Sequence, residues 1–595
     1  MNQVAVKDHR VTLPEVVDAL VAEGLVAAAE AEKFKQERRY FKGDAHPLVV
    51  VAEQKWKSLQ PPHRMLDLEG LAHWMAQWSG LEYLHIDPLK INFSAVTEVM
   101  SNTYATRFRI LPVEVKLNEV VIATAEPFQR GWEAEMKPIL RKEIRRVVAN
   151  PEDISRYQVE FYNLARSVKG ALNKGEASSS VSNFEQLVEL GKTNKQFDAN
   201  DQHIVRIVDW LWQYAFEQRA SDIHVEPRRD LGIVRFRIDG VLHQVYQIPM
   251  TVLNAMTSRI KVLGRMDIME KRRPQDGRIK TRMPDGQEVE LRLATLPTAF
   301  GEKLVMRIFD PEVLVRDFSD LGFAPEEAAI WRNMSSQPNG IILVTGPTGS
   351  GKTVTLYTTL KNLATPQVNV CTLEDPIEMV ESSFNQVQIQ ADIGVGFAEG
   401  IRALMRQDPD IIMVGEIRDL ETADMAIQAA LTGHLVVSTL HTNDAPSAIT
   451  RLIDLGVPPY LLSATVLGVM AQRLVRTLCP SCKQPGGLRA EDDDAWTALV
   501  APWKSTKPTQ LYHPAGCLDC RMTGYKGRVG IYEIMPMSPE LKKVVATGAE
   551  LSRIRDLAMR EGMKPLRIAG AKKVAAGLTT IAEIIKVAPP MFDAT

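Results

Sequence analysis

The sequence predicts an α/β protein whose largest part is a mostly parallel β-sheet covered by helices. The first observation is the stretch GIILVTGPTGSGKTV at 340–354, an apolar run that breaks into a glycine-rich loop and then opens a helix. The same order of strand, loop and helix recurs after it, with predicted strands at 368–373, 411–414 and 435–440. A pair of CxxC motifs, at 479–482 and 517–520, predicts a small metal-binding subdomain within this part.

Length and charge limit the classes of protein that fit. A chain of 595 residues is long enough for about four domains of ordinary size. Lys and Arg number 71 against 73 Asp and Glu, so no overall basic field favours nucleic acid and we expect no nucleic-acid partner. No apolar run approaches the roughly 18 residues that span a bilayer, and the start MNQVAVKDHR lacks the apolar segment of a secretory signal. We therefore expect a cytoplasmic protein.

Residues 1–166 are expected to form an N-terminal docking or regulatory domain of the α+β type. Apolar residues recur at helical spacing within 11–38, and a second amphipathic stretch carries Trp74 and Trp78. We assign these tryptophans to a core, although Trp is also favoured where a partner docks. The segment 108–127 alternates strand-like runs with turn residues.

Between this domain and the next, residues 167–200 are rich in Lys, Gly, Ser, Asn and Ala and are expected to be a flexible linker. The following module, 201–315, contains strands in which arginines alternate with apolar residues. Arg278, Arg292 and Arg307 are thereby predicted on one face of a sheet. Two interpretations remain open: a solvated face, or arginine fingers that stabilise phosphate charge from their own subunit or from a neighbour.

The loop after 340–345 has the spacing of a P-loop. Its glycines allow successive backbone N–H groups to point inward, so that the loop and the positive end of the next helix can enclose a phosphate. Lys352 can reach the β- and γ-phosphates of ATP, and the Thr353 hydroxyl can bind Mg²⁺. The expected nucleotide-binding residues are Gly346, Pro347, Thr348, Gly349, Ser350, Gly351, Lys352 and Thr353.

Polar residues follow the three later strands of the core, within 316–595. Because ligands of α/β sheets bind beyond the carboxyl ends of the strands, Glu374, Glu416 and His441 are expected near the γ-phosphate. ATP hydrolysis requires one carboxylate to orient the attacking water and another to hold the metal or a metal-bound water. Glu374 and Glu416 are the candidates, and the sequence does not assign which is the base. His441 is preferred over His434 as a γ-phosphate sensor.

The four cysteines Cys479, Cys482, Cys517 and Cys520 have the spacing of a structural Zn²⁺ site. Four thiolates leave no open position, so we expect a structural role rather than a catalytic one for this metal, within a subdomain at 476–530. The remaining cysteine, Cys371, lies in an apolar strand and is assigned to the core.

The motifs GPTGSGKT, TLEDPIE, RQDPDIIMVGEIRD and LTGHLVVSTLHTNDA, followed by the tetracysteine pattern, resemble the secretion ATPases of type II secretion and type IV pilus assembly. In the preceding module, ASDIHVEP, RFRIDG, PQDGRI and GEKLVMRI are similar to that family's second N-terminal, PAS-like domain. The resemblance implies a RecA-like ATPase core and hexameric rings. It also implies ATP binding between the two domains, with Arg278, Arg292 and Arg307 as phosphate-binding arginines.

The same resemblance implies partners. It predicts a motor that is peripherally associated with the inner membrane, where it acts on a platform protein and docks on the cytoplasmic domain of a membrane component. Some members bind cyclic di-GMP through an Arg-Leu-Gly pattern. The nearest counterpart here is Arg10-Val11-Thr12, in which Thr replaces the expected Gly. Docking is therefore the preferred role for the N-terminal domain.

A second functional class is a nucleotide-binding regulatory scaffold without productive turnover. The presence of Glu374, Glu416 and His441 argues against it. A third, a nucleic-acid motor on the same core, conflicts with the near-neutral charge.

Overall fold

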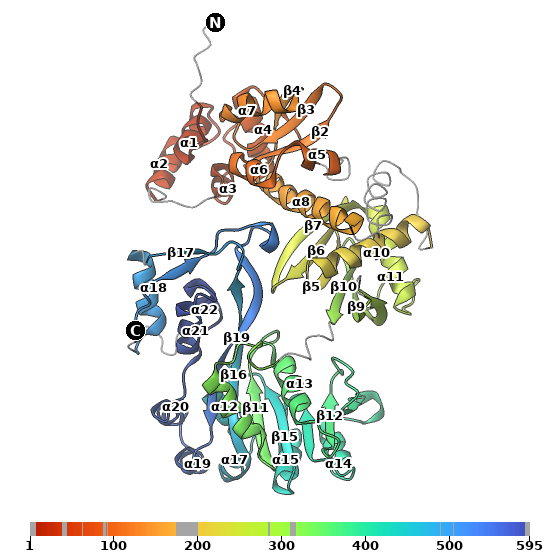
Figure 1. The fold of residues 1–595 in the computed structure, drawn as a ribbon, viewed down its shortest axis with the longest axis vertical. Coiled ribbons are helices and arrows are strands. Elements are labelled where there is room, and N and C mark those ends of the chain that lie inside the picture. The colour runs from red at the N-terminus through yellow and green to blue at the C-terminus, as the bar shows by residue number, and fades with distance from the viewer. Residues whose placement is uncertain are drawn as a thin grey trace. The chain divides into compact units, whose positions relative to one another are not determined.

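The computed structural model describes residues 8–37, 45–61, 63–86, 91, 93–173, 200–283, 286–309, 317–487, 490–503 and 505–588. The chain divides into two compact units. The first consists of Met1–Ile279 and Arg292–Arg307, and the second of Lys280–Leu291 and Ile308–Thr595. Figure 1 draws the first unit mostly in red to yellow and the second mostly in green to blue. The four-stranded sheet belongs to the first unit and the seven-stranded sheet to the second, and each unit has its own buried core.

The N-terminal part of the first unit is an α+β fold around a four-stranded sheet with the order β1-β4-β3-β2. The strands are β1 (Glu82–Tyr83), β2 (Ile110–Val115), β3 (Glu119–Thr124) and β4 (Glu143–Val148). The helices are α1 (Leu13–Ala22), α2 (Ala28–Glu37), α3 (Pro47–Ala52), α4 (Leu68–Ser79), α5 (Phe93–Val99), α6 (Asn102–Phe108), α7 (Gly131–Leu140) and α8 (Pro151–Asn173).

Local signals explain the first helices. Thr12 and Glu15 form a capping box at the start of α1, and Gly80 ends α4 in a left-handed conformation. Trp74 is 7% exposed and belongs to the core, as predicted, and its indole donates to Glu23 Oε2 at 2.7 Å. The helix α8 extends to Asn173, beyond the predicted domain end at 166. The rest of the predicted linker, apart from Asn200, lies outside the described residues.

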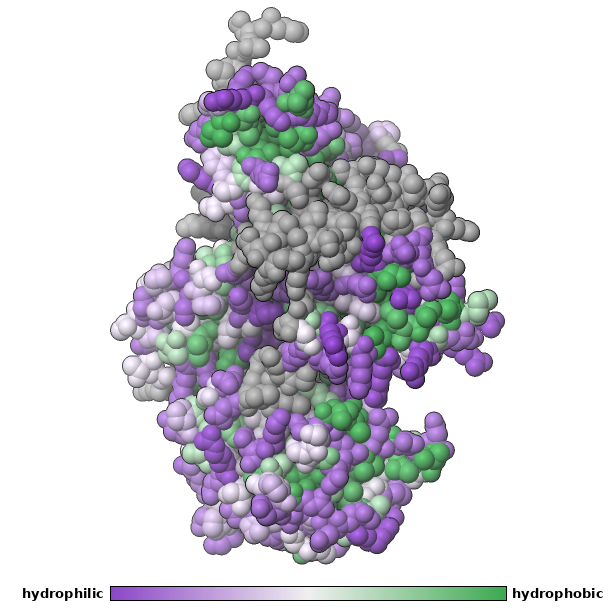
Figure 2. Space-filling model, turned by 45° about the vertical axis from the view of Figure 1, so that its right-hand side comes forward, coloured by the Kyte–Doolittle hydropathy of each residue, from purple (hydrophilic) through white to green (hydrophobic). Residues whose placement is uncertain are grey.

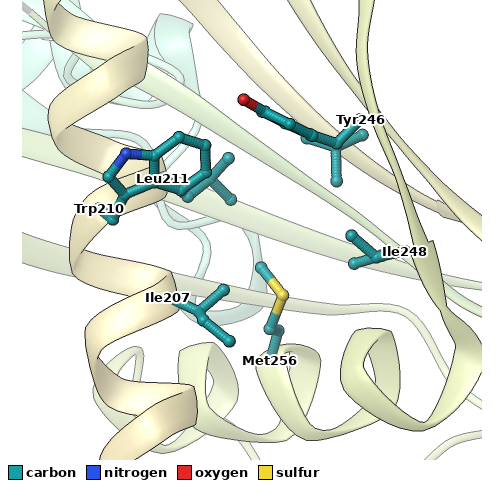
Figure 3. Close-up of a pocket in the computed structure, with 7 residues that line it drawn as sticks. Ile207, Trp210, Leu211, Tyr246, Ile248 and Met256 are labelled. Carbon is teal, nitrogen blue, oxygen red and sulfur yellow. The ribbon is translucent and has the colours of Figure 1, made fainter. Parts of the chain in front are cut away.

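The next part of the chain is a second α+β fold with a six-stranded sheet, ordered β7-β6-β5-β10-β9-β8. Most of it belongs to the first unit, but its residues 280–291 and 308–309 are assigned to the second. Its strands are β5 (Ala220–Pro227), β6 (Leu231–Ile238), β7 (Val241–Pro249), β8 (Gln275–Arg282), β9 (Glu288–Thr298) and β10 (Gly301–Phe309). The helices α10 (Gln202–Glu217) and α11 (Met250–Leu263) pack on this sheet. Between them lies a small apolar pocket, lined by Ile207, Trp210, Leu211, Val234, Tyr246, Ile248 and Met256 (Figure 3). Because apolar core residues of both helices and the sheet line it, we interpret this pocket as a gap in the packing rather than as a binding site.

The second unit contains a seven-stranded sheet with the order β13-β12-β14-β15-β11-β16-β19. All its strand pairs are parallel except β16 with β19, which confirms the predicted mostly parallel sheet. Its strands are β11 (Gly340–Thr345), β12 (Val370–Glu374), β13 (Asn385–Gln388), β14 (Ile411–Val414), β15 (Leu435–Leu440), β16 (Val466–Leu478) and β19 (Tyr525–Pro536).

Helices cover both faces of this sheet, so the side chains on both faces of strand β11 are buried. Ile341 and Leu343 belong to one buried cluster and Ile342 and Val344 to another, because successive side chains of a strand point to opposite faces. The helices are α12 (Pro325–Ser335), α13 (Lys352–Leu363), α14 (Phe397–Leu404), α15 (Leu420–Leu431), α16 (Ala445–Asp454), α17 (Pro459–Thr465), α19 (Pro539–Ala546), α20 (Leu551–Arg560), α21 (Leu566–Ala575) and α22 (Ile581–Val587). A continuous apolar strand such as β11 is typical of a sheet buried on both sides.

The cysteine motifs lie in an insertion between the antiparallel neighbours β16 and β19. It contains β17 (Gln484–Gly486), α18 (Ala490–Val500), β18 (Leu511–His513) and the short helix η4 (Leu518–Cys520). No described helix is long and apolar enough to span a membrane. The face drawn in Figure 2 is largely hydrophilic, with smaller hydrophobic patches between the polar residues.

Candidate active site and metal centre

The loop between β11 and α13 has the backbone of a phosphate cradle. Gly346 has a φ angle of +152° and Gly351 of +89°, values that L side chains rarely adopt. A Cβ added to Gly346 would also lie 2.6 Å from the carbonyl oxygen of Gln472, so only glycine fits there. Helix α13 begins directly after the loop, and no side chain among the described residues caps its N-terminus. Its first N–H groups therefore stay available for an anion.

Lys352 is the first residue of α13. Its Nζ donates to the carbonyl oxygens of Gly346 at 2.7 Å and Pro347 at 3.2 Å, which are contacts that a phosphate could replace. Burial lowers the pKa of Lys352 to about 8, the negative charge of Glu416 opposes this shift, and the positive charge of Arg473 adds to it. Thr353 is the next residue of the helix and is half-buried.

The three predicted strand-end residues lie at one edge of the sheet. Strands β12, β14, β15 and β11 are parallel neighbours in this order, so their carboxyl ends and the P-loop lie along the same edge. Glu374 ends β12, Glu416 follows β14 by two residues, and His441 follows β15 directly. His434 is at the other end of β15, where its Nδ1 lies 2.8 Å from the carbonyl oxygen of Ala429.

Glu374 is only 3% exposed, and its carboxylate accepts several hydrogen bonds from within the unit. Tyr357 donates to its Oε2 at 2.6 Å, and Thr372 and Gln386 donate to its Oε1 at 2.6 Å and 3.1 Å. Burial, with the adjacent Glu374 carboxylate, raises the pKa of Tyr357 far above its ordinary value, so this phenol stays a donor. Glu374 is therefore held tightly in place.

Glu416 has a different environment. Its side chain is 16% exposed, it contacts the guanidinium of Arg418, and its Oε2 lies 3.3 Å from Nε2 of His441. The His441 side chain is 52% exposed. Two hydrogen bonds to backbone carbonyl oxygens fix this region. Thr439 Oγ1 donates to the carbonyl oxygen of Gly415 at 2.7 Å, and the N–H of Ile417 donates to that of Thr439 at 3.1 Å. Glu416 and His441 thus form a pair that solvent can reach.

The sequence did not single out two residues that contact these motifs. Tyr357, on the second turn of α13, connects the P-loop helix to Glu374. Arg473, on β16, lies beside Gly346 and is 5% exposed. Arg473 lies in a strand of mostly apolar residues (VMAQRLV). A charged residue in such a strand is unusual, and this is the sequence signal that could have identified Arg473.

The arginines of the first unit occupy the predicted alternating positions. Arg278 on β8, Arg292 on β9 and Arg307 on β10 sit next to buried residues of the same strands, so they belong to the face opposite the apolar core. Arg307 Nε donates to Asp222 Oδ1 at 3.0 Å. The three arginines belong to the first unit and the P-loop belongs to the second, so the position of each is described only within its own unit.

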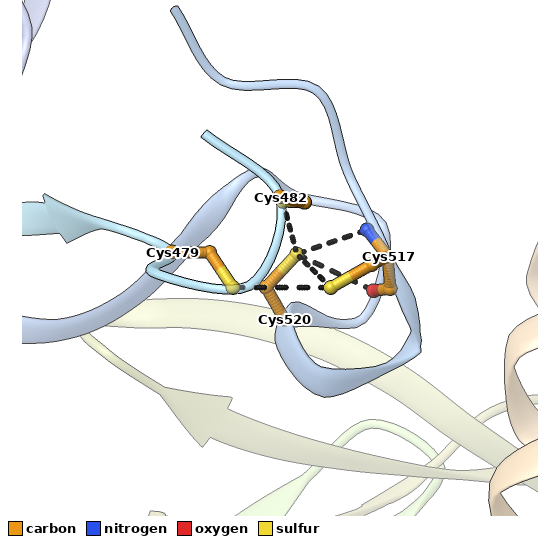
Figure 4. A group of neighbouring side chains, drawn as sticks. All are labelled: Cys479, Cys482, Cys517 and Cys520. Carbon is orange, nitrogen blue, oxygen red and sulfur yellow. Dashed lines mark hydrogen bonds between the residues drawn. The ribbon is translucent and has the colours of Figure 1, made fainter. Parts of the chain in front are cut away.

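Four cysteine sulfurs lie close together at the base of the insertion (Figure 4). The distances are 3.8 Å between Cys479 and Cys517, 3.8 Å between Cys482 and Cys520, and 3.7 Å between Cys517 and Cys520. Sulfurs placed tetrahedrally about 2.3 Å from a zinc ion would be separated by about 3.8 Å, so the geometry of this cluster fits the metal. Backbone N–H groups of Cys517 and Gly524 donate to Cys520 Sγ, both at 3.2 Å, and hold this sulfur in place.

In the N-terminal domain the segment Arg10-Val11-Thr12 makes structural contacts. Arg10 donates to the carbonyl oxygen of Arg107 at 2.5 Å, the N–H of Val11 to Glu126 Oε2 at 2.9 Å, and Thr12 caps α1. These contacts fix the start of the domain, and none of them identifies a ligand.

Residues 198–586 match the model of the family described as type II/IV secretion system protein, and residues 79–168 match the MshEN domain. The first match spans well over half of the chain. The chain belongs to the type II/IV secretion system protein family. This confirms the resemblance to secretion ATPases and the predicted fold class.

Several curated relatives of this secretion-family chain are similar over most of its length. A protein of Acinetobacter baylyi named type IV pilus assembly ATPase TfpB is 54% identical over 91% of this chain and 92% of its own. The type IV pilus assembly ATPase PilB of Myxococcus xanthus is 41% identical over 84% of this chain and 87% of its own. Type II secretion system protein E of Pseudomonas aeruginosa is 43% identical over 71% of this chain and 82% of its own.

Proposed function

We propose that this chain is an ATP-hydrolysing hexameric motor that powers assembly of a type IV pilus or a type II secretion pseudopilus at the inner membrane. The observation that carries the proposal is the arrangement of the second unit. Its P-loop, its Glu416–His441 pair and its buried Glu374 lie along one edge of a parallel sheet. The similarity over 91% of the chain to a relative named a type IV pilus assembly ATPase favours a pilus as the assembled fibre.

The nucleotide would bind through the loop Gly346 to Thr353. Its triphosphate would replace the carbonyl oxygens of Gly346 and Pro347 as partners of the Lys352 ammonium. Mg²⁺ is the metal that suits this site, because the Thr353 hydroxyl and the nearby carboxylates offer oxygen ligands. When bound, Mg²⁺ would neutralise part of the phosphate charge.

Glu416 is the proposed general base and Glu374 the proposed positioning carboxylate. A base must reach a water molecule, and Glu416 is partly exposed and contacts Arg418 and His441, whose side chains are exposed to solvent. Glu374 is buried, and both of its oxygens already accept hydrogen bonds from side chains. It is therefore better suited to hold neighbouring groups in place. His441 would sense the γ-phosphate, since its contact with Glu416 couples the imidazole to the proposed base.

Arg278, Arg292 and Arg307 are proposed to supply positive charge to the phosphates from the first unit. Their positions on paired strands hold their backbones rigidly, as an arginine finger requires. Asp222, which pairs with Arg307, would compete with the phosphate for that guanidinium. They would act either within one subunit or across the ring, and mixed rings of variant subunits distinguish the two.

The cysteine cluster is proposed to hold one structural Zn²⁺. Four sulfur ligands complete its coordination, so the metal would stabilise the insertion between β16 and β19 rather than take part in hydrolysis. The N-terminal domain is proposed to dock on the cytoplasmic domain of a membrane component, while the ring acts on an inner-membrane platform protein. This would place the protein on the cytoplasmic side of that membrane.

The first experiment compares ATP turnover of the full-length protein, its Lys352→Ala variant and its Lys361→Ala variant, with the oligomeric mass of each. Lys361 is a matched control because it lies on the same helix and pairs with Glu381 at 3.0 Å, away from the loop. We expect turnover in the wild type and the control, and none in Lys352→Ala. Mixed rings of Lys352→Ala and Arg307→Ala subunits would regain activity only if the arginine acts across subunits. A ring that binds ATP but never hydrolyses it, even with its membrane partner, would favour the regulatory scaffold.

A further inference from the structure

Arg473 is a buried cation at the base of the P-loop. It lies on β16, which pairs with β11 in parallel, and it is 5% exposed. Its Nη1 donates to the carbonyl oxygen of Gln472 at 3.0 Å. Its Nη2 donates to the carbonyl oxygen of Asn443 at 2.9 Å and to Asn443 Oδ1 at 3.3 Å. All these acceptors are uncharged.

The charge of this guanidinium is not paired with a carboxylate among the described residues. Within the part of the chain that the structure describes, no carboxylate oxygen forms an ion pair with Arg473. Burial lowers its pKa, and Glu533 and Asp444 oppose this from a greater distance. A buried cation without a close counterion is unfavourable unless another anion offsets it. The adjacent phosphate cradle is where such an anion would bind.

Arg473 lies directly against the start of the cradle. A Cβ added to Gly346 would be 3.0 Å from Nη1 of Arg473, so the guanidinium occupies the space beside this glycine. Lys352 also donates to the carbonyl oxygen of Gly346, at 2.7 Å. Two cations thus flank one glycine of the loop, and their charges are added to that of the helix N-terminus.

The other end of the guanidinium holds a second motif. Asn443 is two residues beyond His441, which contacts Glu416 at 3.3 Å. Because β11 lies between β16 and β15 in the sheet, the Arg473 side chain crosses the carboxyl end of β11 to reach Asn443. A single side chain therefore connects the P-loop to the segment that carries His441.

We propose that Arg473 is a positioning residue for ATP hydrolysis, which fixes the His441 segment relative to the P-loop and supplies permanent positive charge to the phosphate site. The inference rests on the proposed function, because it takes a nucleoside triphosphate as the anion. The two roles, charge and positioning, can be tested separately. A lysine at this position would keep the positive charge but could not donate to both Asn443 and Gln472 as the guanidinium does.

The test uses three full-length variants, Arg473→Gln, Arg473→Lys and Arg476→Gln. Arg476 is the matched control: it lies on the same strand but pairs with Glu583 at 2.6 Å, away from the loop. For each protein we would measure the unfolding midpoint, the dissociation constant of a non-hydrolysable ATP analogue, and kcat. Arg473→Gln should weaken analogue binding by about tenfold or more and lower kcat. Arg473→Lys should bind nearly as the wild type does but keep the lower kcat.

The comparison of affinity with kcat distinguishes a role in hydrolysis from mere stability. A change in stability alone would leave the affinity and kcat of the folded variant near those of the wild type, whereas Arg473→Gln should lower both and Arg473→Lys should lower kcat alone.

Two results would overturn the inference. One is a folded Arg473→Gln variant with wild-type affinity and kcat. The other is a loss of affinity and kcat that Arg476→Gln reproduces. Should Arg473→Gln fail to fold, a wild-type kcat in Arg473→Lys would still contradict the positioning role. A wild type that neither binds nor hydrolyses ATP would instead refute the proposed function.

Discussion

His441 Nε2 lies 3.3 Å from Glu416 Oε2, so residues that follow two adjacent parallel strands form one pair at the edge of the sheet. Glu374 ends the next strand along, yet it bonds to Tyr357 and belongs to a separate, buried group. The two candidate carboxylates therefore differ in what they can do. One contacts solvent-accessible side chains, and the other is enclosed by hydrogen-bond donors.

Replacing the two carboxylates should have different effects. Glu416→Gln keeps the size and polarity of the side chain but removes the base, so kcat should fall by about 10² to 10⁴-fold while ATP still binds. Glu374→Gln should cause a smaller loss of kcat and a clear loss of stability, because one buried donor then faces an amide N–H₂ group. Steady-state turnover, nucleotide affinity and urea unfolding of both variants check this. The reverse order of kcat losses would make Glu374 the base.

Tyr357→Phe should reveal what holds Glu374 in position. The variant keeps the packing of α13 but removes the donor that lies 2.6 Å from Glu374 Oε2. Leaving a buried carboxylate oxygen short of one partner should lower the free energy of unfolding by about 1 to 3 kcal/mol. Denaturant unfolding measures this, with Tyr460→Phe as a control because Tyr460 is 64% exposed. Equal stabilities of the two variants would show that the phenol does not support Glu374.

The sequence predicted the elements that depend on local pattern. A short stretch of sequence is enough to show the P-loop spacing, an apolar strand or a CxxC pair. Strand β11, the parallel sheet and the cysteine cluster could therefore be predicted from the sequence alone. Arg473 could not be linked to Gly346 in this way, because their contact depends on β16 pairing with β11 more than a hundred residues away. The different roles of Glu374 and Glu416 also depend on tertiary neighbours such as Tyr357 and Gln386.

Removing the proposed zinc should destabilise the insertion between β16 and β19. Cys482→Ser should lower the metal content from about one zinc per chain to nearly none and lower the unfolding midpoint, because structural zinc contributes directly to folding. Cys371→Ser is the control: this cysteine is buried in β12, and its Sγ donates to Asn369 rather than to the cluster. Elemental analysis and thermal unfolding provide the measurements. A full zinc content in Cys482→Ser would contradict the four-cysteine site.

The stability of the second unit should depend on pH through Glu533. This carboxyl is 2% exposed, and it accepts from the N–H groups of Ala445 at 2.8 Å and Leu566 at 3.3 Å. Burial raises the pKa of Glu533 to about 7 from an ordinary value of 4.5, so the folded chain holds this proton more tightly than the unfolded chain. The resulting stabilisation is fully present below pH 4.5 and is lost as the pH rises through about 7.

Glu533→Gln isolates this contribution because an amide cannot lose the proton. The amide has only one acceptor oxygen for the two N–H groups, so the variant also loses some stability. This loss of unfolding free energy does not change with pH. The difference in unfolding free energy, variant minus wild type, should therefore increase from pH 5 to pH 8 by up to about 3 kcal/mol. Urea unfolding of both zinc-loaded proteins at several pH values measures it, and the comparison cancels the pH dependence of the cysteine site. Parallel curves across this range would show that Glu533 does not change its protonation there.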